Sequence, residues 1–276
     1  MGLKKLIAAS AAILLAVTLS GCNSTDGNSA EKGAAAHTEK SAGDKFTVGF
    51  DASFPPFGYK DEQTGEYTGF DLELAAEVAQ RNDWEFVPQP IDWDAKDAEL
   101  NSGTIDCIWN GFTINGREDK YTFSDPYVDN SIVFVTKKDS GINNEKDLAG
   151  KVVLVQADSS GLAALEDEEN ADLVASFAQL QQVPDYNNAF LTLEAGAADA
   201  IAVDLGVAKY QLEQRGSDKF VVLDPPFHTE QYGIGFKLGN EQLRDQVQKS
   251  LDEMKKDGTF LELAQKYQLE NAVIVE

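Results

Sequence analysis

Residues 100–108 read Leu100-Asn-Ser-Gly103-Thr-Ile-Asp106-Cys-Ile108, and residues 193–201 read Leu193-Glu-Ala-Gly196-Ala-Ala-Asp199-Ala-Ile201. Both follow the pattern L-x-x-G-x-x-D-(C/A)-I, which is typical of a helix end, a glycine turn and a buried strand. The repeated pattern predicts two similar α/β lobes. Ligands of open α/β sheets bind beyond the carboxyl ends of the strands. We therefore expect Asn110-Gly111 and Val203-Asp204 to face one another across a cleft.

Predicted strands and helices alternate along most of the chain. Phe70, Leu74 and Val78 recur every four residues, which places them on one face of a helix. The predicted strands are 46–50, 85–87, 105–109, 152–155, 174–177 and 200–203. The predicted helices are 70–82, 95–100, 161–167, 189–195, 241–256 and 260–267. This alternation predicts an α/β architecture with mainly parallel sheets.

The chain is strongly acidic, with a formal net charge of −24 at pH 7. A phosphate backbone would be repelled, so the composition argues against nucleic-acid binding. The two histidines and two cysteines lack the paired spacing of metal ligands. We therefore expect no metal or other cofactor, and we expect Cys107, within an apolar strand, to be a buried thiol.

The N-terminus resembles a bacterial lipoprotein signal peptide. Lys4 and Lys5 precede the apolar segment 6–19, which is shorter than the roughly 20 residues of a membrane-spanning helix. Small residues then precede Cys22 in Leu19-Ser-Gly-Cys22, as in a lipobox. We expect residues 1–21 to be removed and Cys22 to carry a diacylglycerol lipid. The alternatives are an ordinary secretory cleavage site and an uncleaved tether. The polar residues 22–44 predict a flexible tether.

A series of further motifs occurs in order along residues 45–270. The motifs are Val48-Gly-Phe-Asp51-Ala-Ser-Phe54-Pro-Pro-Phe57, Gly69-Phe-Asp71, Trp93, Asn110-Gly-Phe-Thr113-Ile-Asn-Gly-Arg117-Glu, Phe123-Ser-Asp-Pro-Tyr127, Gln156-Ala-Asp-Ser159-Ser-Gly161 and Val203-Asp204. Together they resemble the amino-acid solute-binding proteins of ABC importers, which have the type II periplasmic-binding-protein fold. The resemblance implies two lobes, each a mainly parallel sheet flanked by helices, joined by two hinge strands. It also implies capture of a free L-amino acid and its delivery to an ABC transporter permease.

The resemblance also implies a division of the chain. Lobe 1 is expected to contain 45–130 and 231–276, and lobe 2 to contain 131–230, with linkers at 129–132 and 228–233. Closing two lobes about such hinges clamps a ligand. We expect a monomer on the extracytoplasmic face of the cell membrane, attached to that membrane by its lipid.

A zwitterionic amino acid needs partners for its α-carboxylate. The resemblance assigns Arg117 to this group, which a guanidinium binds bidentately. The alternative for Arg117 is an exposed surface arginine. Thr113, Ser159 and Ser160 would add N–H and hydroxyl donors. The alternative for the two serines is capping of the helix that follows.

The α-ammonium needs an anionic partner, and the resemblance assigns Asp204 to it. Asp204 follows a buried strand, where a carboxylate is costly unless it is paired. Gly111, next to Asn110, would lend its carbonyl to the same ammonium. The alternative for Asp204 is capping of the helix that begins at Leu205.

The ligand side chain would lie between aromatic walls formed by Phe54, Phe57 and Trp93, for which the alternative is a place in the core. Asp51 and Gln156 would face the end of that side chain, and the alternative for Asp51 is capping of the turn at Ser53-Phe54. Asp51 would repel an acidic ligand and would remain unpaired beside an aliphatic one. We therefore expect a polar or basic L-amino acid, with glutamine, arginine or histidine ahead of cystine.

Two features depart from the family pattern. The interval from Thr113 to Arg117 is one residue shorter, and we expect Gly116 to tighten this loop with a positive φ. Asp158 stands where glycine is frequent, and we expect it to point outward or to cap a helix.

Two other functional classes remain open. Some proteins of this fold are dehydratase-type enzymes, and others are surface adhesins or sensors. The zwitterion-binding set is complete without a general acid, so we expect no enzymatic activity.

Overall fold

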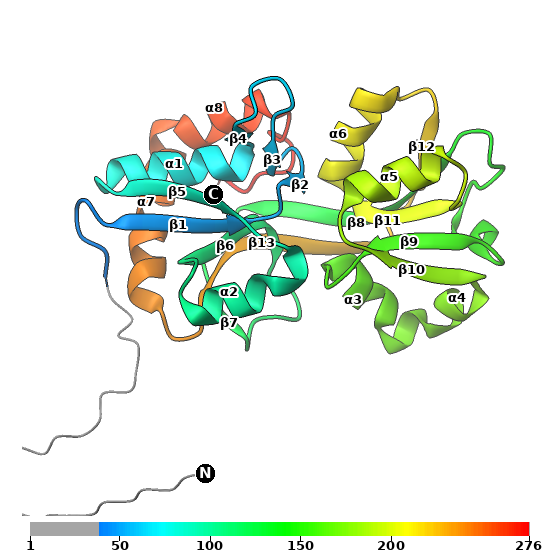
Figure 1. The fold of residues 1–276 in the computed structure, drawn as a ribbon, viewed down its shortest axis with the longest axis horizontal. Coiled ribbons are helices and arrows are strands. Elements are labelled where there is room, and N and C mark those ends of the chain that lie inside the picture. Colours follow the sequence, from blue (N-terminus) through cyan, green and yellow to red (C-terminus); the bar gives the residue numbers. More distant parts are fainter. Residues whose placement is uncertain (1–38, 276) are drawn as a thin grey trace, which may run out of the picture. The chain divides into compact units, whose positions relative to one another are not determined.

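The structure is a computed structural model that describes residues 39–275, which belong to one compact unit. Figure 1 shows two α/β lobes connected by two long strands, β8 (Val128–Lys137) and β13 (His228–Lys237). The two-lobe α/β fold predicted from the sequence is confirmed. Cys22 and the predicted signal peptide lie outside the described residues.

Lobe 1 is built on three parallel strands, with β1 between β5 and β6. Helices lie on both faces of this sheet (Figure 1). The short strands β2, β3 and β4 form a separate sheet. The elements are β1 (Lys45–Phe50), β2 (Ser53–Phe54), β3 (Gly58–Lys60), β4 (Tyr67–Thr68), α1 (Phe70–Arg81), β5 (Glu85–Pro90), η1 (Trp93–Ala95), α2 (Lys96–Ser102), β6 (Cys107–Thr113), β7 (Tyr121–Phe123), α7 (Glu241–Asp257) and α8 (Thr259–Lys266).

Lobe 2 repeats this plan, with β9 between the parallel strands β10 and β11. The elements are η2 (Glu145–Leu148), β9 (Val152–Gln156), α3 (Ser160–Glu166), η3 (Glu168–Asn170), α4 (Ala171–Ser176), β10 (Gln179–Val183), α5 (Tyr186–Glu194), β11 (Ala200–Asp204), α6 (Leu205–Arg215) and β12 (Phe220–Val222).

The long strands β8 and β13 join the two sheets into one. They pair antiparallel from His228 opposite Ile132 to Tyr232 opposite Val128. Beyond this ladder β8 pairs with β11 and β12 of lobe 2, and β13 pairs with β6 and β7 of lobe 1. The strand order is therefore β10-β9-β11-β8-β13-β6-β1-β5.

The repeated pattern has the same structural role in both lobes. Gly103 and Gly196 have positive φ values of 81° and 74° and follow helices α2 and α5. Asp106 Oδ2 then accepts a hydrogen bond of 2.7 Å from Thr47 N in the first half of β1. Asp199 Oδ2 accepts one of 2.9 Å from Val152 N at the start of β9. Each aspartate thus holds the N-terminal half of its neighbouring parallel strand.

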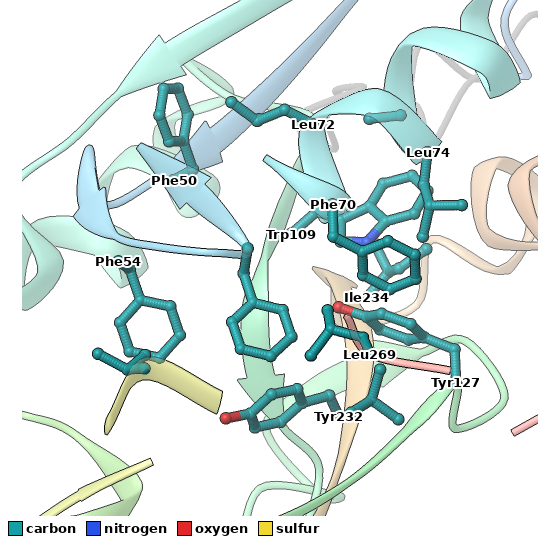
Figure 2. Packing of buried hydrophobic residues seen from close by; sticks show 14 of the residues in the cluster. Phe50, Phe54, Phe70, Leu72, Leu74, Trp109, Tyr127, Tyr232, Ile234 and Leu269 are labelled. Carbon is teal, nitrogen blue, oxygen red and sulfur yellow. The ribbon is translucent and has the colours of Figure 1, made fainter. Parts of the chain in front are cut away.

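Aromatic side chains contribute much of the core. Phe70 begins α1, and its ring lies 6.4 Å from Tyr127 and 5.7 Å from Phe260. Figure 2 shows Phe70 beside Tyr127, with Leu74 on the same helix. The four-residue spacing predicted this buried face correctly, because Phe70, Leu74 and Val78 are all fully buried. Cys107 is also fully buried, as predicted.

Two sequence-based expectations about strands are wrong. The apolar residues 174–177 were expected to form a strand, but most of them lie in helix α4, and β10 (Gln179–Val183) follows. β10 is an edge strand with a polar sequence, so it lacks the apolar run typical of a buried strand. Asn110 and Gly111 do not follow their strand but lie within β6, whose seven residues are all buried.

The segment preceding β1 is bound to lobe 1. Lys40 N donates to Gln246 Oε1 at 2.9 Å, and Lys40 Nζ lies 2.9 Å from Asp106 Oδ1. Gly43 N donates to Asp83 O at 2.7 Å. Residues 40–44, which the sequence placed in the tether, are therefore held against the domain.

Candidate functional site

The polar ends of four parallel strands meet between the lobes. Asp51 follows β1, Thr113 ends β6, Gln156 ends β9 and Asp204 ends β11. All four are buried, although their side chains are polar. A buried polar group is costly unless it is hydrogen-bonded. The contacts of these groups therefore define a candidate binding site, here called the interlobe site.

Asp204 lies at the centre of the interlobe site and is 3% exposed. Its Oδ1 accepts hydrogen bonds from Tyr232 Oη at 2.5 Å and from Asn130 Nδ2 at 2.8 Å. Figure 2 shows the Tyr232 hydroxyl pointing away from Tyr127 and out of the aromatic cluster. Asp204 precedes α6 but makes no side-chain capping hydrogen bond. Its carboxylate is thus directed to Tyr232 and Asn130 and does not serve the helix.

Burial, together with the charge of Glu230, raises the pKa of Asp204 to about 7. The hydrogen bonds from Tyr232 and Asn130 act in the opposite direction, because they favour the ionised form. An added positive charge stabilises the ionised form of such a carboxylate. The Asp204 carboxylate is therefore a suitable partner for an ammonium group.

Glu230 is a second buried carboxylate, which sequence reasoning did not identify. It lies on β13 and is 4% exposed. Its Oε1 accepts from Thr113 Oγ1 at 2.9 Å, from Asn130 Nδ2 at 2.8 Å and from Ser160 Oγ at 3.1 Å. The available sequence signal was the position of Glu230 two residues before Tyr232, on the same face of a strand.

The two serines have different roles. Ser159 is the N-cap of α3, and its Oγ accepts from Leu162 N at 3.1 Å. The same hydroxyl donates to Gln156 O at 2.8 Å. Ser160 donates to Glu230. The capping alternative therefore describes the hydroxyl of Ser159, whereas the hydroxyl of Ser160 is directed to the carboxylate of Glu230.

Arg117 is half-buried at the edge of the site. Its Nη1 donates to Thr113 O at 3.2 Å, and the guanidinium lies 4.8 Å from the centre of the Phe112 ring. Within residues 39–275 the guanidinium forms no ion pair. Gly116 has a φ of 77°, as predicted, and Arg117 N donates to Ile114 O at 2.9 Å. This turn shortens the loop and directs the guanidinium back toward Thr113.

Asp51 and Gln156 form the opposite end of the site. Gln156 Nε2 donates to Asp51 Oδ2 at 2.7 Å, and Ser53 N donates to Asp51 Oδ1 at 2.7 Å. Asp51 therefore caps its turn, as the capping alternative expected, and also contacts Gln156 across the lobes. Asn110 Oδ1 accepts from Asp51 N at 3.0 Å and positions this residue. Gly111 N donates to the buried Asp71 Oδ2 at 2.7 Å.

Asp51 also lines a cavity of about 670 Å³ between the lobes. Trp93 forms one wall of it, and Pro184 of lobe 2 contributes to the other. Five of the lining residues are acidic, and none of those described is basic; the acids are Asp51, Asp92, Asp94, Glu99 and Asp185. The electrostatic environment therefore favours a cation in this cavity.

The three predicted aromatic walls are placed differently. Trp93 lines the acidic cavity, whereas Phe54 is 6% exposed and packs 5.7 Å from Phe57 and 6.0 Å from Tyr186. Phe57 is 1% exposed and lines a separate cavity of about 570 Å³ beside α6. The structure thus brings Trp93 to the acidic cavity and places Phe57 in the core behind Phe54.

A cation at the cleft was also missed by sequence reasoning. Lys96 of α2 is 2% exposed and forms an ion pair with Asp158 of lobe 2. Its Nζ lies 5.1 Å from the centre of the Trp93 ring. Burial lowers the pKa of Lys96, while Asp158 opposes that shift. Asp158 has a φ of 55° and does not cap α3. Its side chain is exposed, as expected, and its carboxylate bridges the lobes by pairing with Lys96.

The described residues offer neither a metal-binding group of side chains nor a candidate membrane-spanning helix. In residues 39–275, no group of three or more His, Cys, Asp or Glu side chains is arranged to hold a metal ion. None of the helices described is long and apolar enough to cross a bilayer.

Comparisons with known proteins place this geometry in context. A family model of bacterial extracellular solute-binding proteins, family 3, matches residues 46–270. The L-cystine-binding protein TcyA of Bacillus subtilis (strain 168) is 32% identical over 223 residues, which cover 80% of each chain. The glutamine-binding protein of Geobacillus stearothermophilus is 31% identical over 242 residues, covering 81% of this chain and 88% of the relative.

Solved structures agree with these relatives. The substrate-binding protein of an ABC uptake transporter from Streptococcus pneumoniae, with bound histidine, is 37% identical and superposes with a TM-score of 0.77. The match covers 81% of this chain and 92% of that one. All three relatives are amino-acid-binding proteins, and none is named as an enzyme.

Proposed function

Since the chain belongs to family 3 of the bacterial extracellular solute-binding proteins, we propose that it binds a free polar or basic L-amino acid and delivers it to an ABC transporter permease. The observation that carries this proposal is the arrangement of charges in the interlobe site. Asp204 is a buried carboxylate suited to an ammonium, and Arg117 is a cation at the edge of the same site that forms no ion pair within residues 39–275. An α-amino acid presents the complementary pair of charges.

Arg117 would bind the α-carboxylate through its guanidinium, with added donors from Thr113 and from the backbone at Ser159 and Ser160. The ligand side chain would extend towards Asp51 and Gln156, with Trp93 and Phe54 beside it. Five acidic side chains around the adjoining cavity favour a basic side chain such as that of arginine or histidine. A glutamine side chain would exchange hydrogen bonds with Gln156 and Asp51.

Lobe closure would hold the ligand. We assign 45–130 and 231–276 to lobe 1, 131–230 to lobe 2, and the hinges to 129–132 and 228–233. The antiparallel ladder between β8 and β13 supports this division, because in the described part of the chain this ladder joins the two parallel sheets. Contacts from Gln156 to Asp51 and from Asp158 to Lys96 join the lobes in the described conformation.

The protein would act outside the cytoplasm as a lipid-anchored monomer. The support for anchoring is the sequence Leu19-Ser-Gly-Cys22 after an apolar segment. The tether would run from Cys22 to the start of the bound segment at Lys40. We propose binding without chemical conversion of the ligand, since the site already supplies partners for both charges of an amino acid.

The direct test is isothermal titration calorimetry of the purified domain, residues 37–276, against the common L-amino acids and cystine. We expect micromolar or tighter binding to one or a few polar or basic members. Prephenate-like acids serve as controls for the enzymatic alternative. Tightest binding to glutamate or leucine would contradict the assignment of the side-chain end, and binding to none would contradict the proposed function.

A further inference from the structure

Glu230 has two carboxylate oxygens in very different environments. Its Oε1 accepts three hydrogen bonds, from Thr113, Asn130 and Ser160. Its Oε2 is buried and has no hydrogen-bond partner among the residues that the structure describes. A buried carboxylate oxygen without a donor is costly, because its hydrogen bonds to water are lost and no protein hydrogen bond replaces them. Oε2 is therefore an unused acceptor inside the site.

The position of Glu230 is fixed from three directions. Thr113 belongs to lobe 1, Ser160 to lobe 2 and Asn130 to the hinge strand β8. Together the three donors prevent the carboxylate from rotating away to another partner. Its free oxygen thus has a defined place in the closed site.

Glu230 and Asp204 are also linked to each other. The same atom, Asn130 Nδ2, donates to Glu230 Oε1 and to Asp204 Oδ1, each at 2.8 Å. Neither carboxylate forms an ion pair within residues 39–275. Two buried like charges on one amide repel each other and are stabilised by a cation that contacts both.

We propose that Glu230 is a specificity-determining ligand contact, and that its free Oε2 binds the α-ammonium of the amino acid together with Asp204. This inference rests on the proposed function and deepens it. A primary ammonium has three N–H donors, which the two carboxylates and the carbonyl of Gly111 would satisfy. The site would therefore discriminate strongly against ligands that lack an α-ammonium.

The test is a thermodynamic cycle that combines a protein change with a ligand change. Three probe pairs are available: arginine with 5-guanidinopentanoate, histidine with imidazolepropionate, and glutamine with glutaramate. The second member of each pair lacks only the α-ammonium. The pair used is that of whichever of these three amino acids the full wild-type chain, in detergent, binds most tightly. Dissociation constants are measured for wild type and for Glu230→Gln, which keeps the shape and the Oε1 acceptor.

We expect Glu230→Gln to weaken binding of the amino acid at least tenfold and to change binding of its deaminated partner less than about threefold. A purely structural role would weaken both ligands equally, and that result would overturn the inference. Glu230→Asp keeps the charge and should retain more of the preference for the ammonium than Glu230→Gln does. Should Glu230→Gln not fold, the same cycle is measured with Glu230→Asp. If this variant prefers the amino acid over its deaminated partner as strongly as wild type does, the inference is overturned. A reduced preference would support the inference.

Asp125→Asn is the matched control. Asp125 is an exposed carboxylate between β7 and β8, outside the hinge segments and outside the site. We expect both dissociation constants to stay within about twofold of wild type. A wild-type chain that binds none of the amino acids would overturn the proposed function and this inference together. Wild-type binding with no difference between the two ligands in the Glu230→Gln cycle would overturn this inference alone.

Discussion

Gln156 of lobe 2 donates a hydrogen bond of 2.7 Å to Asp51 Oδ2 of lobe 1, across 105 residues of sequence. Burial raises the pKa of Asp51 to about 6, against the lowering effect of its hydrogen bonds from Ser53 and Gln156. The same carboxylate lines the acidic cavity. In the described conformation Asp51 thus has a neutral hydrogen-bond partner, Gln156. A cationic ligand would interact with the Asp51 carboxylate more strongly than this amide does.

The first prediction concerns the role of Asp51 in selecting the ligand. We expect Asp51→Asn to weaken arginine binding tenfold or more and glutamine binding less than about threefold, because only the guanidinium loses an opposite charge. Calorimetry with both ligands measures the ratio. Asp125→Asn, at an exposed position, is the control and should leave the ratio unchanged. Equal losses for the two ligands would show that the charge of Asp51 does not select the side chain.

The second prediction concerns Arg117. Removing one partner of a buried charge pair costs roughly 2–5 kcal/mol, so Arg117→Ala should weaken binding about thirtyfold or more. Lys120→Ala removes a positive charge from the exposed part of the same loop and should have little effect. Titration calorimetry on both variants provides the comparison. Near-normal affinity in Arg117→Ala would contradict the proposal that Arg117 binds the α-carboxylate of the ligand.

The third prediction concerns the pH dependence of stability. Burial raises the pKa of Asp71 to about 7, and Gly111 and Tyr127 only partly oppose this through their hydrogen bonds. A carboxyl group with a raised pKa binds its proton more tightly in the folded state than in the unfolded state. Stability is therefore lost as pH rises from about 4 to about 7. Asp204, with a pKa of about 7, acts in the same direction.

We accordingly expect the melting temperature of the ligand-free domain to fall by about 5 °C or more between pH 5 and pH 8. Differential scanning calorimetry measures this profile. Asp71→Asn should flatten it, whereas Asp139→Asn, at an exposed position, should not. A melting temperature that rises over this range in the wild type would contradict the assigned direction of these pKa shifts.

The fourth prediction concerns anchoring. We expect Cys22→Ala to release or mislocalise the protein, because the acyl chains supply the apolar surface that inserts into the membrane. Cell fractionation reports the location, and mass spectrometry of the wild type should find a lipid on Cys22 as the first mature residue. A mature N-terminus elsewhere, without lipid, would show that the export signal is of the ordinary secretory kind.

Local patterns in the sequence determined much of the architecture. The spacing of Phe70, Leu74 and Val78 predicted a buried helix face, and the repeated pattern around Asp106 and Asp199 predicted two related lobes. These signals work because burial of one face imposes a period on neighbouring residues. The prediction of a strand at 174–177 was wrong because this segment is too short to show a period. A run of only a few apolar residues fits a short helix as well as a strand.

The tertiary structure alone decided which charges meet in the site. Thr113 and Glu230 are 117 residues apart, and Lys96 and Asp158 are 62 apart, yet each pair is in contact. No local period links such residues, because their proximity depends on how two sheets join through β8 and β13. The sequence by itself therefore determined most of the helices and buried strands, the family resemblance and the individual candidates Asp51, Arg117 and Asp204. Only the folded chain added Glu230, because burial and an unpaired oxygen are properties of its three-dimensional surroundings.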